Sequence, residues 1–117
     1  MIFILKRNSA TGVYEEYQQI SLSGSLEVFY CAITDDHMKF VVERQNLVYI
    51  YEFNPSTLLF ESAQNISVSS NPSSLDITND HQYLMVATQS SNAYLYKYDS
   101  TSYVLHQTIV LESTANF

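Results

Sequence analysis

One phrase occurs twice in this chain, and the repetition constrains its fold more than any other feature. The segment ITDDHMKFVV, at 33–42, returns as ITNDHQYLMV at 77–86, 44 positions later. Self-similarity at a fixed spacing is typical of repeat architectures, in which each repeat is one structural unit that packs against the next. The sequence therefore predicts a stack of similar units.

The repetition extends well beyond this phrase. YIYEFNPSTLLF, at 49–60, matches YLYKYDSTSYVL at 94–105 with an offset of 45, and FILKRNSATGVY, at 3–14, matches the middle copy with an offset of 46. The change from 44 to 45 corresponds to one extra residue in QSSNAY compared with QNLVY, and such insertions belong in turns. The chain thus holds two full copies and the second half of an earlier one.

Each full copy divides into four short apolar runs separated by turn-forming residues, which is the pattern of consecutive antiparallel strands. The composition agrees, because ten Tyr and six Phe accompany only two Gly and two Pro. Ten strands are predicted: IFILKR (2–7), VYEEYQQISL (13–22), EVFYCAIT (27–34), MKFVVER (38–44), LVYIYEF (47–53), LLFESAQNISV (58–68), SLDIT (74–78), QYLMVAT (82–88), AYLYKY (93–98) and YVLHQTIVL (103–111).

The strands differ in how much of their surface must be covered. Both faces of LVYIYEF are apolar, so this strand is expected to be buried on both sides, whereas LLFESAQNISV becomes polar after Phe60, as an outer edge strand should. Four antiparallel strands per copy, with buried inner strands and a polar outer strand, describe a blade of a β-propeller. A two-sheet β-sandwich remains the alternative.

Two segments, CAITDDHMKFVVERQNLVYIYEF and LDITNDHQYLMVATQSSNAYLYKYD, resemble the blades of WD-repeat and related propellers. The match is degenerate, since Ser23-Gly24 and Ser69-Ser70 stand where the family has Gly-His. Glu52-Phe53 and Lys97-Tyr98 replace its Trp-Asp pair. The resemblance implies an all-β propeller fold and a role in protein–protein scaffolding. Propellers of the surface-protein and lactonase-like kinds share the strand order.

The copies predict a single partial propeller with a half blade at 1–24, a blade at 25–69 and a blade at 70–117. Propellers usually close into rings of roughly four to eight blades, so this arc would leave apolar faces at both ends. We expect these faces to be covered by the remaining blades of a longer propeller, by copies of the chain, or by another polypeptide. A protein partner or self-association through the open blade faces is therefore predicted.

The charge balance excludes one class of partner. Five basic and twelve acidic residues give a net charge of −7, whereas a nucleic-acid binder needs a basic face. No apolar stretch approaches the roughly 20 residues that span a bilayer, and the opening MIFIL does not resemble a signal peptide. We expect no membrane insertion and leave the compartment open, with the cytoplasm favoured. The sequon at Asn65 supports a secreted or cell-surface repeat protein as an alternative.

Two acidic turns contain candidate metal ligands. Asp35, Asp36 and His37 lie in the first turn, and Asp80 and His81 lie in the second. Turns between strands commonly use Asp or Asn to bond their own backbone, and the next residue tolerates a left-handed conformation. We therefore predict turn residues with solvent-exposed histidines, and no metal site.

No reactive set stands out elsewhere. The chain lacks a Gly-x-Ser-x-Gly elbow, and its two glycines, Gly12 and Gly24, are too few for a phosphate-binding loop. Glu15 and Glu16 fall on a polar outer strand, and His106 has no repeating acid or thiol nearby. The sequence predicts no catalytic residue, no cofactor and no enzyme.

Three further kinds of residue are notable. Asp76, whose counterpart is Ala32, is predicted to face channel water or to bond to the next blade, because the innermost strand of a blade lines the channel. Cys31, the only cysteine, is predicted to be a small buried core residue. The recurring tyrosines are predicted to pack between blades with their hydroxyls reaching solvent or a partner: Tyr49, Tyr51, Tyr83, Tyr94, Tyr96 and Tyr98.

The function predicted from these features is a non-catalytic β-propeller segment that acts as a protein–protein interaction scaffold. One alternative is an arc of a catalytic or ligand-binding propeller whose site residues lie in other blades, with Asp76 among the residues near the channel axis. The other is the secreted or cell-surface repeat protein.

Overall fold

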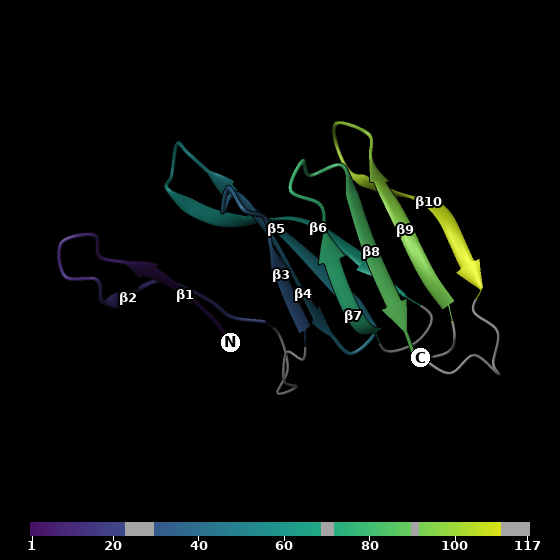
Figure 1. The fold of residues 1–117 in the computed structure, drawn as a ribbon, viewed down its shortest axis with the longest axis horizontal. Coiled ribbons are helices and arrows are strands. Elements are labelled where there is room, and N and C mark those ends of the chain that lie inside the picture. The colour runs from purple at the N-terminus through teal and green to yellow at the C-terminus, as the bar shows by residue number, and fades with distance from the viewer. Residues whose placement is uncertain (23–29, 69–71, 90–91, 111–117) are drawn as a thin grey trace.

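The computed structural model describes residues 1–22, 30–68, 72–89 and 92–110, which form ten β-strands and no helix (Figure 1). No membrane-spanning helix therefore occurs in these ranges. In chain order the strands are β1 (Ile2–Arg7), β2 (Tyr14–Ile20), β3 (Tyr30–Ile33), β4 (Lys39–Arg44), β5 (Leu47–Asn54), β6 (Leu59–Ser67), β7 (Pro72–Ile77), β8 (Tyr83–Thr88), β9 (Asn92–Tyr98) and β10 (Tyr103–Val110).

The strands form two four-stranded antiparallel sheets and one hairpin. Sequential neighbours pair throughout, in the orders β3-β4-β5-β6 and β7-β8-β9-β10, and β1 pairs with β2. Figure 1 shows the hairpin, the first sheet and the second sheet following one another across the molecule. The repeated phrase runs from the end of β3 into β4, and again from the end of β7 into β8, so its two copies occupy equivalent places.

The β3–β6 sheet is covered on one face by the β7–β10 sheet and on the other by the β1–β2 hairpin. Each of these contacts forms a separate hydrophobic core. Val41, Val48 and Ile50 pack against Leu84 and Val86 of the second sheet. The opposite face contacts the hairpin, through Phe40, Val42, Tyr51 and Phe60 on the sheet and Ile2, Ile4, Ile20 and Leu22 on the hairpin side. A two-layer sandwich would leave the outer face of this sheet in solvent. The predicted propeller blades are confirmed, and the sandwich alternative is wrong.

Successive units present different side chains on their two faces. We call the face toward the preceding unit the leading face and the face toward the following unit the trailing face. The leading face of β5 carries Tyr49, Tyr51 and Phe53, while its trailing face carries Val48 and Ile50. The leading face of β9 is aromatic again, with Tyr94, Tyr96 and Tyr98. At both junctions an aliphatic trailing face therefore packs on an aromatic leading face, which buries large rings against compact side chains.

The outer hairpins share a β-bulge at one position. The register between paired strands skips Tyr17 in β2, Ala63 in β6 and His106 in β10. A bulge adds one unpaired residue and bends the strand locally. Because the irregularity recurs in all three units, it belongs to the repeat and is not an accident of one hairpin.

Cys31 is exposed, so the prediction that it is buried is wrong. It lies opposite Val42 in the register, on the leading face of the β3–β6 sheet. The packing on this face joins the hairpin to residues of β4, β5 and β6 and leaves out β3. Ile33, on the same face of β3, is 54% exposed for the same reason.

Some predictions fall outside the described residues. These are the boundaries at 24/25 and 69/70, the segments Ser23-Gly24 and Ser69-Ser70 that replace Gly-His, and the start of the predicted strand at 27–29. Asn65 of the sequon is described, and it lies exposed on the outer strand β6.

Candidate functional site

The two acidic turns have the same internal structure. The Thr34 hydroxyl donates to the Asp36 carboxylate at 2.6 Å, and the Thr78 hydroxyl donates to Asp80 at the same distance. Each carboxylate also accepts a backbone N–H two residues later at 3.0 Å. The short polar side chains thus replace backbone partners that the tight turn leaves unpaired.

The two histidines occupy the left-handed position of these turns. The φ angles of His37 and His81 are 60° and 65°, and each backbone N–H donates to the carbonyl of the threonine three residues earlier at 2.9 Å. The predicted turn role is therefore confirmed. Their side chains differ, because His37 is exposed whereas the side chain of His81 is 24% exposed and ion-paired. The prediction that both histidines are solvent-exposed is wrong for His81.

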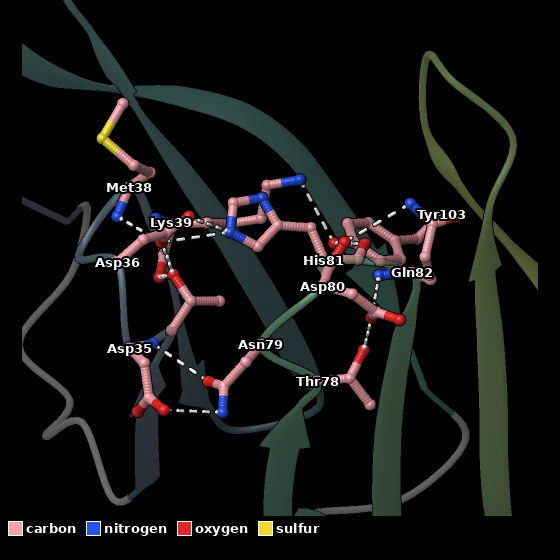
Figure 2. Close-up of polar contacts among 11 residues, drawn as sticks. Asp35, Asp36, Met38, Lys39, Thr78, Asn79, Asp80, His81, Gln82 and Tyr103 are labelled. Atoms are coloured by element: carbon pink, nitrogen blue, oxygen red, sulfur yellow. Dashed lines mark hydrogen bonds and ion pairs between the residues drawn. The ribbon is translucent and has the colours of Figure 1, made fainter.

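The turns bond to each other across the gap between the two blades (Figure 2). The Asn79 amide donates to the Asp35 carboxylate at 2.8 Å, and its oxygen accepts the Asp35 N–H at 3.0 Å. His81 Nε2 lies 2.9 Å from Asp36 Oδ2. The candidate ligands thus have two roles, in shaping the turns and in joining one turn to the next, and Asp36 and His81 serve in both.

Hydrogen bonding controls the charge of Asp36. The Thr34 hydroxyl, the Met38 N–H and His81 all favour the ionised carboxylate, and they lower its pKa to about 2. Hydrogen bonds from Thr78 and from the backbone likewise lower the pKa of Asp80. Both turns therefore carry negative charge at neutral pH.

A buried lysine lies beneath the turns. Lys39 is 2% exposed, its Nζ lies 3.2 Å from the Tyr103 hydroxyl, and that hydroxyl donates to the His81 carbonyl at 2.6 Å. The ammonium also lies over the rings of Tyr98 and Tyr103, at 4.3 and 4.9 Å from their centroids. Desolvation lowers the pKa of Lys39 and raises that of Tyr103. We call this chain of contacts, from Lys39 through Tyr103 to His81, the junction relay.

Few of the described side chains at the junction between the two blades are available to bind a metal ion or to act as a nucleophile. Within the described ranges, no three His, Cys, Asp or Glu side chains gather where they could hold a metal ion. Each threonine hydroxyl at the turns already donates to a carboxylate. The arrangement fixes two blades against each other through complementary hydrogen bonds between their turns.

The other singled-out residues lie apart from the junction. His106 is exposed on β10 with its ring against Tyr83, and Glu15 and Glu16 are exposed on β2, where they accept hydrogen bonds from nearby amides. The recurring tyrosines are buried or half-buried, as predicted.

Asp76 is exposed on β7, on the face turned away from the β3–β6 sheet. β7 is the first strand of its sheet, and it contacts β3, the first strand of the preceding sheet. The face that carries Asp76 is the one on which a following blade would pack, so its two predicted environments, channel water or a bond to the next blade, stay predictions. Ala32, its counterpart, packs against the core between the sheets.

A second set of contacts between units was not predicted from the sequence. The Gln18 amide donates to the Phe60 carbonyl and accepts the Phe60 N–H, both at 2.8 Å. One unit later, Gln64 makes the same pair of bonds to Tyr103, at 2.9 and 2.8 Å. We call each pair a glutamine clamp. The recurrence of QQIS as QNIS was the available signal, because it places both glutamines at the same position of the repeat.

The fold and these junctions define the class of protein: an incomplete β-propeller with two four-stranded blades and the outer hairpin of a third. Several solved structures share this fold. A protein from Lactobacillus plantarum matches with a TM-score of 0.71 and 17% identity, over 97% of this chain and 37% of its own. A periplasmic gluconolactonase from Pseudomonas aeruginosa matches with a TM-score of 0.70 and 14% identity, over 95% and 34%.

A third structure, from Bacteroides fragilis, carries the provisional name 6-phosphogluconolactonase. It matches with a TM-score of 0.74 and 13% identity, over 94% of this chain and 33% of its own. The chain therefore spans about a third of the length of these structures. No protein-family model and no curated protein matches it. At this identity the likeness establishes the fold.

These structures correct one prediction. The prediction of no enzyme is contradicted, because two structures with this fold are named as lactonases. The prediction rested on the lack of a reactive motif in the sequence, and such a lack does not exclude activity in a fold that hosts many functions. The comparisons lend no support to the WD-repeat resemblance or to a scaffold role, and the named structures are of the lactonase-like kind that shares the strand order.

Proposed function

We propose that this chain is an arc of a β-propeller that binds and converts a small polar ligand at its axis, with Asp76 on the inner wall. The similar structures are about three times as long, which gives about seven blades at one blade per ~45 residues. On this proposal the remaining blades supply the other site residues, and the junctions hold the inner strands in place.

The carboxylate of Asp76 carries the proposal. It lies on the first strand of its blade, and the equivalent position of the preceding blade is Ala32, which serves packing. An exposed carboxylate accepts hydrogen bonds from the hydroxyl groups of a sugar-like ligand. The names of two similar structures suggest a sugar-acid lactone as the first ligand to test.

The test is a titration of isotope-labelled protein with gluconolactone and gluconate, followed by amide NMR. Residues of β3 and β7 should shift, and Asp76→Asn should remove these shifts. Glu61→Gln, which changes an exposed carboxylate on the outer strand β6, is the matched control and should leave them unchanged. Shifts confined to the outer strands, or unaltered in Asp76→Asn, would contradict the proposal.

A further inference from the structure

A third glutamine, Gln107, occupies the position of the two clamp glutamines but makes neither clamp bond. Gln107 follows the bulge of β10 as Gln18 and Gln64 follow theirs, since the three residues pair with Leu95, Ile4 and Ile50 at the same step of the register. Gln18 and Gln64 are half-buried against the next unit, whereas Gln107 is exposed. Its side chain makes no hydrogen bond with a described residue.

Tyr14, in the β1–β2 hairpin, occupies the position of the two clamped residues and is not bonded by a glutamine. Phe60 and Tyr103, the two clamped residues, pair with Phe53 and Tyr98, and Tyr14 occupies the same position opposite Arg7. The Asn8 N–H donates to the Val13 carbonyl, so the adjacent pair that contains Tyr14 is a non-hydrogen-bonded pair. The N–H and C=O of Tyr14 therefore point away from β1, as a clamp requires.

The leading face of the β1–β2 hairpin and the trailing face of β9–β10 match in the same way as the faces that meet at the two internal junctions. The free leading face of the hairpin carries Phe3, Leu5 and Tyr14, which are 58%, 57% and 64% exposed. They correspond in register to the aromatic set Tyr49, Tyr51 and Phe60. The trailing face of β9 and β10 carries Leu95 and Ile109, which are half-buried and correspond to the aliphatic residues Ile50 and Ile66.

We propose that a second copy of this chain docks head to tail, with the trailing face of β9–β10 on the leading face of the β1–β2 hairpin of the other copy. Gln107 then clamps the backbone of Tyr14, and Leu95 and Ile109 cover Phe3 and Leu5. The contact repeats for a third time the junction that the chain forms twice within itself. Because the two faces differ, the contact is heterologous and leaves a free face at each end of the dimer.

The first test is sedimentation of the purified chain over a range of concentrations. The wild type should associate, and more tightly at high salt, because each copy carries a net charge of −7. Gln107→Ala should weaken the dissociation constant about tenfold, through the loss of two hydrogen bonds. Thr108→Ala, at the next exposed position of β10, is the control and should have no effect. A monomer at every concentration and salt level would overturn the proposal.

The second test distinguishes head-to-tail docking from other modes. Leu5→Asp blocks the leading face and Ile109→Asp blocks the trailing face, so each variant alone should be monomeric. Mixed in equal amounts they should form a one-to-one dimer, because one variant keeps each of the required faces. Association of either variant by itself, or no dimer in a mixture of folded variants, would show that the proposed faces do not meet. Circular dichroism of each variant checks that the fold is kept.

Discussion

The Nζ of Lys39 lies 3.2 Å from the hydroxyl of Tyr103, although 64 positions separate the two residues. Lys39 begins the second strand of one blade, and Tyr103 begins the outer strand of the next. A buried ammonium requires hydrogen-bonding and electrostatic partners, and here the tyrosine hydroxyl and two aromatic rings supply them. The contact therefore links the two blades from within the core.

Tyr103→Phe should lower the free energy of unfolding by about 1–3 kcal/mol, because it removes a hydroxyl that bonds to both Lys39 and the His81 carbonyl. Tyr98→Phe keeps an aromatic ring at position 98 over Lys39 and removes no hydrogen bond of the junction relay, so its effect should be smaller. Urea unfolding of both variants measures the difference. Equal losses would indicate that the relay adds nothing to ring packing.

Gln64→Ala should destabilise the fold by about 1–2 kcal/mol, because loss of the clamp leaves the Tyr103 N–H and C=O without partners. Gln18→Ala should act in the same direction on the hairpin. Gln107→Ala is the matched control, and thermal unfolding at a concentration where the chain is monomeric should find it unchanged. A comparable loss in the control would mean that the clamp bonds are not the cause.

Asp36→Asn should flatten the acid unfolding profile. The pKa of Asp36 is lowered to about 2 from 3.8, so its contribution to stability is present above 3.8 and is lost as the pH falls toward 2. The variant should therefore lose less stability than the wild type across that window. Denaturant unfolding at several pH values measures this, with Asp76→Asn as the exposed control. Parallel profiles for wild type and Asp36→Asn would contradict the assigned hydrogen bonds.

Glu43→Gln should raise stability at neutral pH by about 1–3 kcal/mol. Glu43 is 1% exposed, its Oε2 lacks a hydrogen-bond partner, and desolvation raises its pKa above 4.5. A raised carboxyl pKa means that the wild type is most stable below 4.5 and loses stability as the pH rises through the folded-state value. The gain from Glu43→Gln should accordingly vanish at low pH. A gain that is the same at all pH values would indicate a packing effect instead.

The strands were predictable because their signals are local. All ten predicted strands are present, since runs such as LVYIYEF combine β-forming residues with apolar faces and end at turn formers. The turn role of His37 and His81 followed for the same reason. Cys31 was misplaced because its run is apolar, whereas its exposure depends on how far a separate hairpin extends over the sheet.

The candidate site was less predictable than the strands. Nothing around Lys39 indicates that its ammonium is buried, because the partners lie in the next blade. The His81–Asp36 pair joins residues 45 positions apart, which corresponds to one repeat, so the repeat places them in neighbouring turns without revealing that they touch. The prediction of no enzyme is contradicted by two structures named as lactonases, whose likeness to this chain lies in the fold and not in a local motif.

The sequence by itself determined the unit of this protein: four antiparallel strands, an acidic turn, a polar outer strand, and a period that requires stacking. These follow from alternation and turn chemistry, which act over a few residues. The tertiary structure decided which side chains cross from one unit to the next, including the junction relay, the glutamine clamps and the free Gln107. Such contacts depend on the distance and rotation between stacked sheets, and packing of whole faces sets both.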